Sequence, residues 1–146
     1  MTETRAHDRA HDRAQRFTDR RVLVTGASGG VGRQACELFR AEGARVVGVD
    51  VVPGDGILEG NLADPASIAN VVEQTLAELG GLDVLCNVAG IQAHARLETL
   101  TPELLTKHLA VNVVGPVLLT QGFLPALTES RGNVVTVASI SAMMRR

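Results

Sequence analysis

A glycine-rich turn between a predicted strand and a predicted helix offers the clearest chemistry in this sequence. It follows the apolar run 22–24, and its residues are Thr25, Gly26, Ala27, Ser28, Gly29, Gly30, Val31 and Gly32. Glycines let such a turn be tight, let its backbone approach a phosphate, and let the following helix pack close to the strand. The start of that helix presents unpaired N–H groups and the positive end of its dipole to an anion. The turn predicts a phosphate site, although methyltransferases and loops without a ligand also use such turns.

Asp50 lies at the end of the next predicted strand, where it could bind the adenosine end of a dinucleotide. A carboxylate there can accept hydrogen bonds from both adenosine ribose hydroxyls, and each such bond is worth about 1.5–3 kcal/mol. A 2′-phosphate would meet a like charge, at a cost of up to about 4 kcal/mol for an effective dielectric constant near 20. No Arg or Lys follows in residues 51–53 to offset that charge. The pattern predicts NAD rather than NADP as the cofactor, and the alternative is that Asp50 serves only as a turn or cap residue.

Strands and helices alternate around these residues, and short apolar strands with helices between them are typical of a doubly wound parallel sheet. We expect strands over 22–24, 46–50, 56–62, 83–87 and 132–138, and helices over 30–42, 65–79 and 101–127. The first helix should turn Val31, Ala35, Leu38 and Phe39 towards the sheet. The fold class is therefore α/β, of the Rossmann type, with ligand at the carboxyl ends of about five strands. The domain is expected over 21–146, after a charged, flexible tail over 1–20.

Composition argues against two kinds of partner. The chain has 146 residues, a formal net charge of −2 and a pI near 6.1. It therefore lacks the excess of cations that attracts nucleic acid or anionic lipid. No apolar stretch is expected to reach the ~18 residues that a membrane span needs, and the charged N-terminus shows no export signal.

The cysteines and histidines are predicted to have no metal or redox role. Cys36 and Cys86 lie in apolar runs without metal-ligand spacing, which favours buried, reduced thiols and a cytoplasmic location. Residues 5–14 repeat Arg-Ala-His-Asp and place His7 and His11 one helical turn apart. That pair could hold a metal, but a solvated tail with Asp and Arg pairing across turns is the preferred interpretation.

Four further segments follow the glycine turn in an order that resembles the classical short-chain dehydrogenase/reductase family. They are Asn61-Leu62, Asn87-Val88-Ala89-Gly90, the segment around Asn112 at 111–115, and the strand ending in Ser139. Val88 replaces the second Asn of the family's Asn-Asn-Ala-Gly segment, and Asn61-Leu62 replaces its Asp-Val pair beside the adenine. The resemblance extends the predicted cofactor-binding set to Gly26, Ser28, Gly29, Gly30, Val31, Gly32, Asp50, Asn61, Leu62, Asn87, Ala89 and Gly90.

The resemblance assigns Asn112 and Ser139 to the active site. Pro116, four residues after Asn112, has no N–H, so the Asn112 carbonyl should lose its helical partner and could hold a water in a proton relay. The alternative is a helix kinked for packing. Ser139 is expected to hydrogen-bond a substrate carbonyl, with Ser141 as the competing choice.

The acid of the family's reaction is absent from these residues. Hydride transfer to a carbonyl needs a proton donor, which in this family is a Tyr assisted by a Lys one helical turn away. The sequence has no Tyr, and Lys107 precedes Asn112 by five positions and so lies off its face. We therefore expect a truncated, inactive chain that lacks the C-terminal helix and strands. Val134, Val135 and Val137 would then form an open apolar edge, covered by another chain or by the rest of a longer protein.

Two functions fit these residues. The first is an NAD-dependent short-chain dehydrogenase or reductase, acting on a small-molecule alcohol or carbonyl substrate and forming a homo-oligomer in its complete form. The second is a noncatalytic NAD-binding or interaction module. A methyltransferase would explain the glycine turn and Asp50, but it leaves the segments at 87–90 and 132–139 unexplained.

Overall fold

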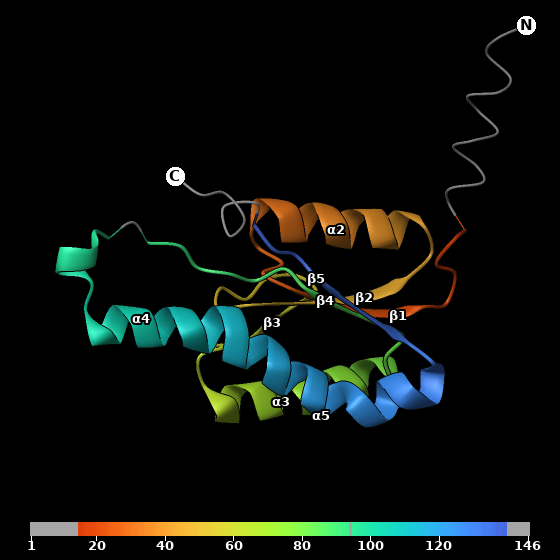
Figure 1. Cartoon of the computed structure of the whole chain (residues 1–146). Helices are drawn as coiled ribbons and strands as arrows, with labels where there is room; N and C mark the ends of the chain where they lie inside the picture. The colour runs from red at the N-terminus through yellow and green to blue at the C-terminus, as the bar shows by residue number, and fades with distance from the viewer. Residues whose placement is uncertain (1–14, 94, 140–146) are drawn as a thin grey trace, which may run out of the picture.

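A parallel sheet with helices on both faces makes up the structure. The computed structural model describes residues 15–93 and 95–139, and within them five strands pair in the order β3-β2-β1-β4-β5. Helix α2 (Gly30–Ala41) covers one face of the sheet. Helix α3 (Pro65–Leu79) and the long helix that contains α4 (Pro102–Leu109) and α5 (Gly115–Ser130) cover the other (Figure 1). The strands are β1 (Arg21–Thr25), β2 (Arg45–Asp50), β3 (Ile57–Glu59), β4 (Val84–Asn87) and β5 (Asn133–Thr136). The predicted fold class is confirmed.

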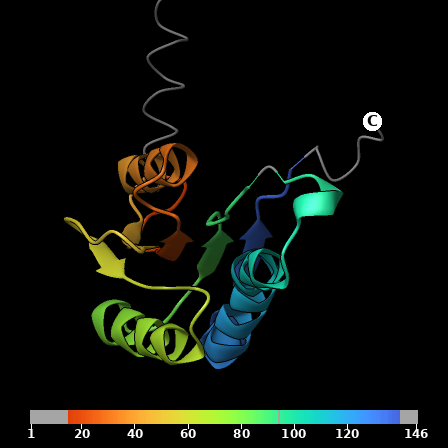
Figure 2. The ribbon, with the colours of Figure 1, turned by 90° about the vertical axis from the view of Figure 1, so that its left-hand side faces the viewer.

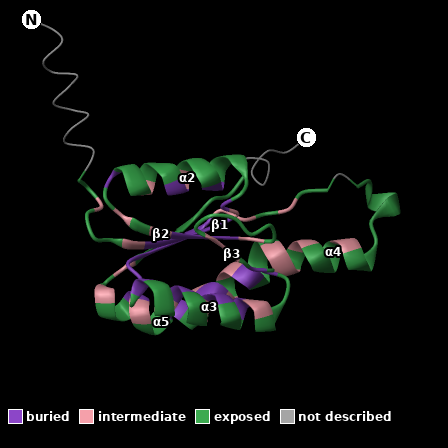
Figure 3. Cartoon of the chain, turned by 180° about the vertical axis from the view of Figure 1, so that it is seen from behind, coloured by how far each residue is buried: buried purple, intermediate pink, exposed green. Residues whose placement is uncertain are grey.

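Strand β1 divides its side chains between two cores because successive residues of a strand point to opposite faces. Val22 and Val24 are fully buried in the cluster under α2, which also holds Cys36 and Cys86. Leu23 is fully buried in the larger cluster under α3 and α5. Figure 3 shows this burial concentrated in the central strands and in the helix faces that meet them.

Helix α2 (Gly30–Ala41) packs through a face one position away from the predicted one. Val31 and Leu38 were expected to point inward, but their side chains are 63% and 62% exposed. Gly32 and Cys36 are buried instead. The reason is the close contact at Gly32, where an added Cβ would lie 2.1 Å from the Gly26 carbonyl oxygen. That contact fixes the rotation of the helix and outweighs the larger apolar side chains.

Helix α3 (Pro65–Leu79) has the predicted ends. The Asp64 side chain accepts a hydrogen bond from the Ala66 N–H at 3.0 Å, and Gly80 ends the helix with a φ of 73°. Such a cap and a left-handed glycine are the usual signals at the two ends of a helix. The preceding strand is shorter than the predicted 56–62, since Asn61 already turns the chain by accepting the Ala63 N–H at 3.0 Å.

The third long helix is continuous from Pro102 to Ser130 but has three parts. These are α4 (Pro102–Leu109), the π-helical η2 (Ala110–Val114) and α5 (Gly115–Ser130), after a short 3₁₀ turn η1 (Leu97–Thr99). In η2 the Gly115 N–H donates to the Ala110 carbonyl, one residue further back than in an α-helix. The sequence predicted a disturbance here, because Pro116 lacks an N–H.

This long helix carries both buried and exposed apolar residues. Gly115, Leu119, Phe123 and Leu127 are buried, and α5 lies against α3. Exposed apolar side chains lie elsewhere on the helix, and they include Leu105, Leu109, Val113, Val117 and Leu124. By length and composition the helix could cross a membrane, although a core helix passes the same test. The expectation that no apolar stretch reaches that length is wrong, because residues 109–128 carry no charged side chain.

Strand β5 forms an open edge of the described sheet. It pairs with β4 on one side, opposite the β3 edge (Figure 2). It ends at Thr136, two residues short of the predicted end. Val134, Val135 and Val137 are 44%, 51% and 52% exposed, as expected for an apolar edge without a neighbouring strand.

Residues 16–19, assigned from sequence to the tail, contact the end of α2. Arg16 pairs with Glu42, and the Phe17 ring packs edge-on against Phe39 at 4.9 Å between centroids. Packing of the Phe17 ring against the half-buried Phe39 ring explains why these residues contact the helix. Residues 1–14, including His7 and His11, lie outside the described residues.

Candidate cofactor cleft

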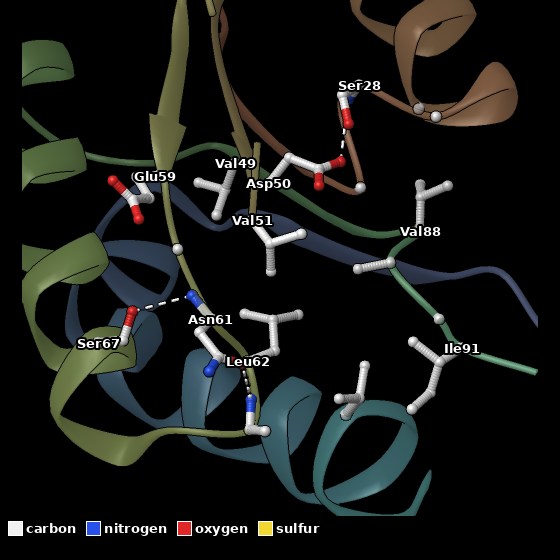
Figure 4. A pocket seen from close by; sticks show the side chains of 18 of the residues that line it. Ser28, Val49, Asp50, Val51, Glu59, Asn61, Leu62, Ser67, Val88 and Ile91 are labelled. Carbon is white, nitrogen blue, oxygen red and sulfur yellow. Dashed lines mark hydrogen bonds between the residues drawn. The ribbon is translucent and has the colours of Figure 1, made fainter. Parts of the chain in front are cut away.

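An open cleft of about 1280 Å³ lies at the carboxyl ends of the strands. It is larger than the roughly 300–1,000 Å³ typical of sites for drug-sized ligands, so it has room for a dinucleotide. Figure 4 shows Ser28 and Asp50 on one side, Asn61 and Leu62 across from them, and Val88 and Ile91 at one end. Every residue of the predicted cofactor-binding set except Asn87 lines this cleft.

The glycine turn brings backbone, rather than side chains, to the cleft wall. Gly26 has a φ of +70°, and an added Cβ there would lie 2.9 Å from the Ala89 Cα. Gly29 precedes α2 and provides no side-chain cap. The first N–H groups of α2 therefore keep their hydrogen-bonding capacity for a ligand at the helix start. Gly30 has open space around it, with nothing within 4 Å of an added Cβ.

Thr25 holds the turn against the loop after β4, a role that the sequence did not indicate. Its hydroxyl is buried and accepts hydrogen bonds from the Val88 and Ala89 N–H groups, both at 3.0 Å. These bonds hold Ala89 beside Gly26, and both residues line the cleft. The partners lie more than sixty residues apart in the chain. The only sequence signal for this contact is the Thr25 hydroxyl at the end of the strand.

Asp50 makes the contacts of a turn residue and also lines the cleft. Its Oδ2 accepts the Ser28 N–H at 3.0 Å and its Oδ1 lies 3.5 Å from the Val52 N, as in a turn, yet the residue also lines the cleft. Partial burial alone would raise the pKa of Asp50, but hydrogen bonds from Ser28, Val52 and Val51 outweigh it and lower the pKa. The carboxylate is therefore ionised and ready to accept further hydrogen bonds.

The Asn61-Leu62 pair forms the floor between Asp50 and the long helix. The Asn61 side chain is engaged in its own turn, while Leu62 is 6% exposed and lines the cleft. An added Cβ at Gly115 would lie 2.7 Å from the Leu62 carbonyl oxygen, so the long helix passes very close to this floor. Lys107 and Val111 line the cleft from that helix.

Asn112 does not line the cleft itself but hydrogen-bonds to Ile91, which does. Its side chain makes two hydrogen bonds with the backbone of Ile91, accepting the N–H and donating to the carbonyl, each at 2.9 Å. Ile91 lines the cleft and Asn112 does not. Asn112 therefore positions the loop after β4.

Asn87 and Ser139 also stand outside the lining. Asn87 is 3% exposed, and its side-chain Oδ1 has no hydrogen-bond partner within the described residues. Its backbone carbonyl accepts the Val137 N–H at 2.9 Å, which continues the β4–β5 pairing. Ser139 is exposed, three residues after β5 ends, and Ser141 lies outside the described residues.

Both cysteines are buried free thiols, as predicted. Burial, with a smaller contribution from nearby Cys36, raises the pKa of Cys86 to about 11. A thiol with such a pKa is protonated at neutral pH and is a poor nucleophile. Among residues 15–93 and 95–139, no group of three or more His, Cys, Asp or Glu side chains could hold a metal ion.

Comparison with known proteins agrees with this geometry. The sequence profile described as short chain dehydrogenase matches residues 20–146. The chain therefore belongs to the short chain dehydrogenase family. It is 33% identical over 141 residues to dehydrogenase/reductase SDR family member 7B of Bos taurus, an alignment covering 82% of this chain and 43% of the relative. It is 32% identical over 142 residues to the 3-oxoacyl-[acyl-carrier-protein] reductase FabG of Escherichia coli, covering 88% and 58%.

Solved structures show the same fold. A short chain dehydrogenase from Burkholderia cenocepacia in complex with NADP superimposes with a TM-score of 0.82 at 27% identity, over 90% of this chain and 60% of that one. The ligand-free aldohexose dehydrogenase of Thermoplasma acidophilum gives 0.81 at 26% identity, over 88% and 53%. This chain thus spans about half the length of the relatives it matches.

Proposed function

We propose that this chain is the NAD(H)-binding part of an oxidoreductase that transfers hydride between an alcohol and a ketone or aldehyde. The observation that carries the proposal is one cleft lined by both the glycine turn and Asp50. In the proposed arrangement the pyrophosphate meets the start of α2, and the adenosine ribose meets Asp50. The nicotinamide then lies towards Ala89, Gly90 and Ile91, and it supplies or accepts the hydride when bound.

Cofactor preference tests the role of Asp50. We expect NADH to bind at least about tenfold more tightly than NADPH, because the 2′-phosphate would face an ionised carboxylate. The Asp50→Asn variant should weaken NADH binding several-fold and narrow that difference, since the amide removes the charge and keeps the shape. Titrations of both cofactors by fluorescence decide the question. Tighter binding of NADPH by the unmodified chain would overturn the preference for NAD.

The 146-residue chain should bind the cofactor without turnover. A developing alkoxide needs a proton donor, and general acids contribute about 10²–10⁴-fold to such reactions. No Tyr is present to serve as that donor, and Asn112 is committed to Ile91. We expect no NADH oxidation above the buffer rate with a panel of ketones and aldehydes. Steady NADH consumption that scales with protein concentration would contradict this expectation.

The remaining parts of the proposal concern partners and location. The substrate class is a small alcohol or carbonyl compound, and the cytoplasmic location is supported by the buried free thiols. The exposed apolar side chains on α4–α5 and the β5 edge support association of the complete protein with further copies.

A noncatalytic NAD-binding module remains the second candidate, favoured by the absence of Tyr from these residues.

A further inference from the structure

Lys107 is the only cation that lines the cleft within the described part of the chain. The other charged residues of the lining are Asp50 and Glu59, both acidic. Lys107 is also the single lysine of the whole sequence. Within the described residues, Lys107 is therefore the one lining side chain that could donate a charge-assisted hydrogen bond to a ligand.

The position of Lys107 on α4 relates it to Leu62 and Ala63 in the wall of the cleft. It lies on α4, one helical turn before Val111, and residues four apart share a helix face. Both residues line the cleft together with Leu62 and Ala63. Lys107 and Ala63 also line a second hollow of about 550 Å³ beside the first, so they form the ridge between the two. This ridge borders the main cleft beside Leu62.

The Lys107 ammonium is not engaged by the part of the chain that the structure describes. The residue is exposed and makes no ion pair there within 4.0 Å. Glu103, one turn earlier, is the natural helical partner. The pKa of Glu103 is lowered by its own backbone and by Thr101, however, and not by Lys107. The ammonium therefore keeps its hydrogen-bonding capacity for a ligand.

We propose that Lys107 donates a hydrogen bond to an acceptor nitrogen on the exposed edge of the adenine and so makes cofactor affinity depend on the base. Leu62 and Val111 provide apolar surface for the faces of the purine, while the ring nitrogens face the rim where an ammonium can reach them. This inference rests on the proposed function, because it places the adenosine half of the cofactor at this end.

The test compares two charge-removing variants against ligands with and without adenosine. In Lys107→Met the apolar stem is kept and the ammonium is lost; in Arg96→Met the same charge is removed from an exposed residue outside the cleft. We expect Lys107→Met to raise the Kd for NADH and for AMP by about three- to tenfold, the range for losing one ordinary, solvent-exposed hydrogen bond. The Kd for reduced nicotinamide mononucleotide, which lacks adenosine, should not change. Arg96→Met should leave all three values unchanged.

Labelling gives a second readout that does not depend on a variant. Because Lys107 is the only lysine, acetylation of its peptide can be followed by mass spectrometry apart from the N-terminal amine. NADH and AMP should slow that acetylation, and reduced nicotinamide mononucleotide should not.

The outcomes separate this inference from the proposed function. If the unmodified chain binds no NADH, the proposed function fails. If it binds NADH but Lys107→Met leaves the Kd values for NADH and AMP unchanged, the role of Lys107 is overturned and the proposed function stands. An equal effect on the mononucleotide would show a long-range charge effect. An effect confined to NADPH would show pairing with the 2′-phosphate, and either result would overturn the contact with the base.

Discussion

Replacing Gly32 with alanine is expected to lower the free energy of unfolding by about 3 kcal/mol, the upper part of the usual range for overpacking. An added Cβ would lie 2.1 Å from the Gly26 oxygen, 2.7 Å from its carbonyl carbon and 3.1 Å from the Ala27 Cα. All three atoms are backbone, so no side chain can swing away to relieve the clash. The turn between β1 and α2 would have to open, and the cleft with it. Urea unfolding followed by far-ultraviolet circular dichroism measures the change.

Gly30→Ala provides the matched control for this prediction. It makes the same chemical change two residues earlier, where an added Cβ meets nothing within 4 Å. We expect its unfolding midpoint to equal or slightly exceed that of the unmodified chain, because alanine favours helix over glycine. Equal midpoints for Gly32→Ala and Gly30→Ala would contradict the packing of α2 on the turn.

Replacing Gly30 with glutamate is expected to weaken NADH binding by at least about 100-fold while the fold is retained. Gly30 lines the cleft at the start of α2, where the proposed pyrophosphate lies. A carboxylate about 4 Å from a phosphate costs up to about 4 kcal/mol at an effective dielectric constant near 20. The same carboxylate stabilises the first turn of a helix through the dipole, so a loss of binding is not expected to come from unfolding. NADH titration and urea unfolding of the same sample measure the two effects.

Gly30→Ala serves again as the control, since a methyl group adds little bulk and no charge. It should bind NADH within about threefold of the unmodified chain. If Gly30→Glu bound NADH as tightly as Gly30→Ala, the phosphates could not lie at the start of α2, and the proposed orientation of the cofactor would be wrong.

The succession of elements could be predicted because each depends on local signals. Asp64 and Pro65 mark the start of α3, Gly80 marks its end, and the apolar run at 22–24 marks a buried strand. The glycine turn and Asp50 were likewise predicted to share a site, since both follow strands whose carboxyl ends meet at one sheet edge.

The features that depend on packing between elements could not be predicted. On α2, the set with Val31 and Leu38 and the set with Gly32 and Cys36 both fit helical periodicity. Only the contact of Gly32 with Gly26 determines which set faces the sheet. The Thr25 hydroxyl finds its partners in the loop after β4, which no local pattern reveals. Pro116 indicated a disturbed helix, but the π-helical form of that disturbance is seen only in the structure.

The proposed role of Lys107 could not be predicted from the sequence either. There Lys107 is considered only as a replacement for the missing catalytic partner, and its position off the face of Asn112 excludes that role. The structure places it on the cleft wall, where its proposed role is at the other end of the cofactor.

The central claim is that this cleft binds a nicotinamide dinucleotide, and titration of the unmodified 146-residue chain with NADH tests it most directly. We predict saturable enhancement of NADH fluorescence with one site per chain, reversed by excess NAD. No saturable signal from a chain that unfolds cooperatively in urea would contradict the claim, and so would binding of S-adenosylmethionine in place of NADH.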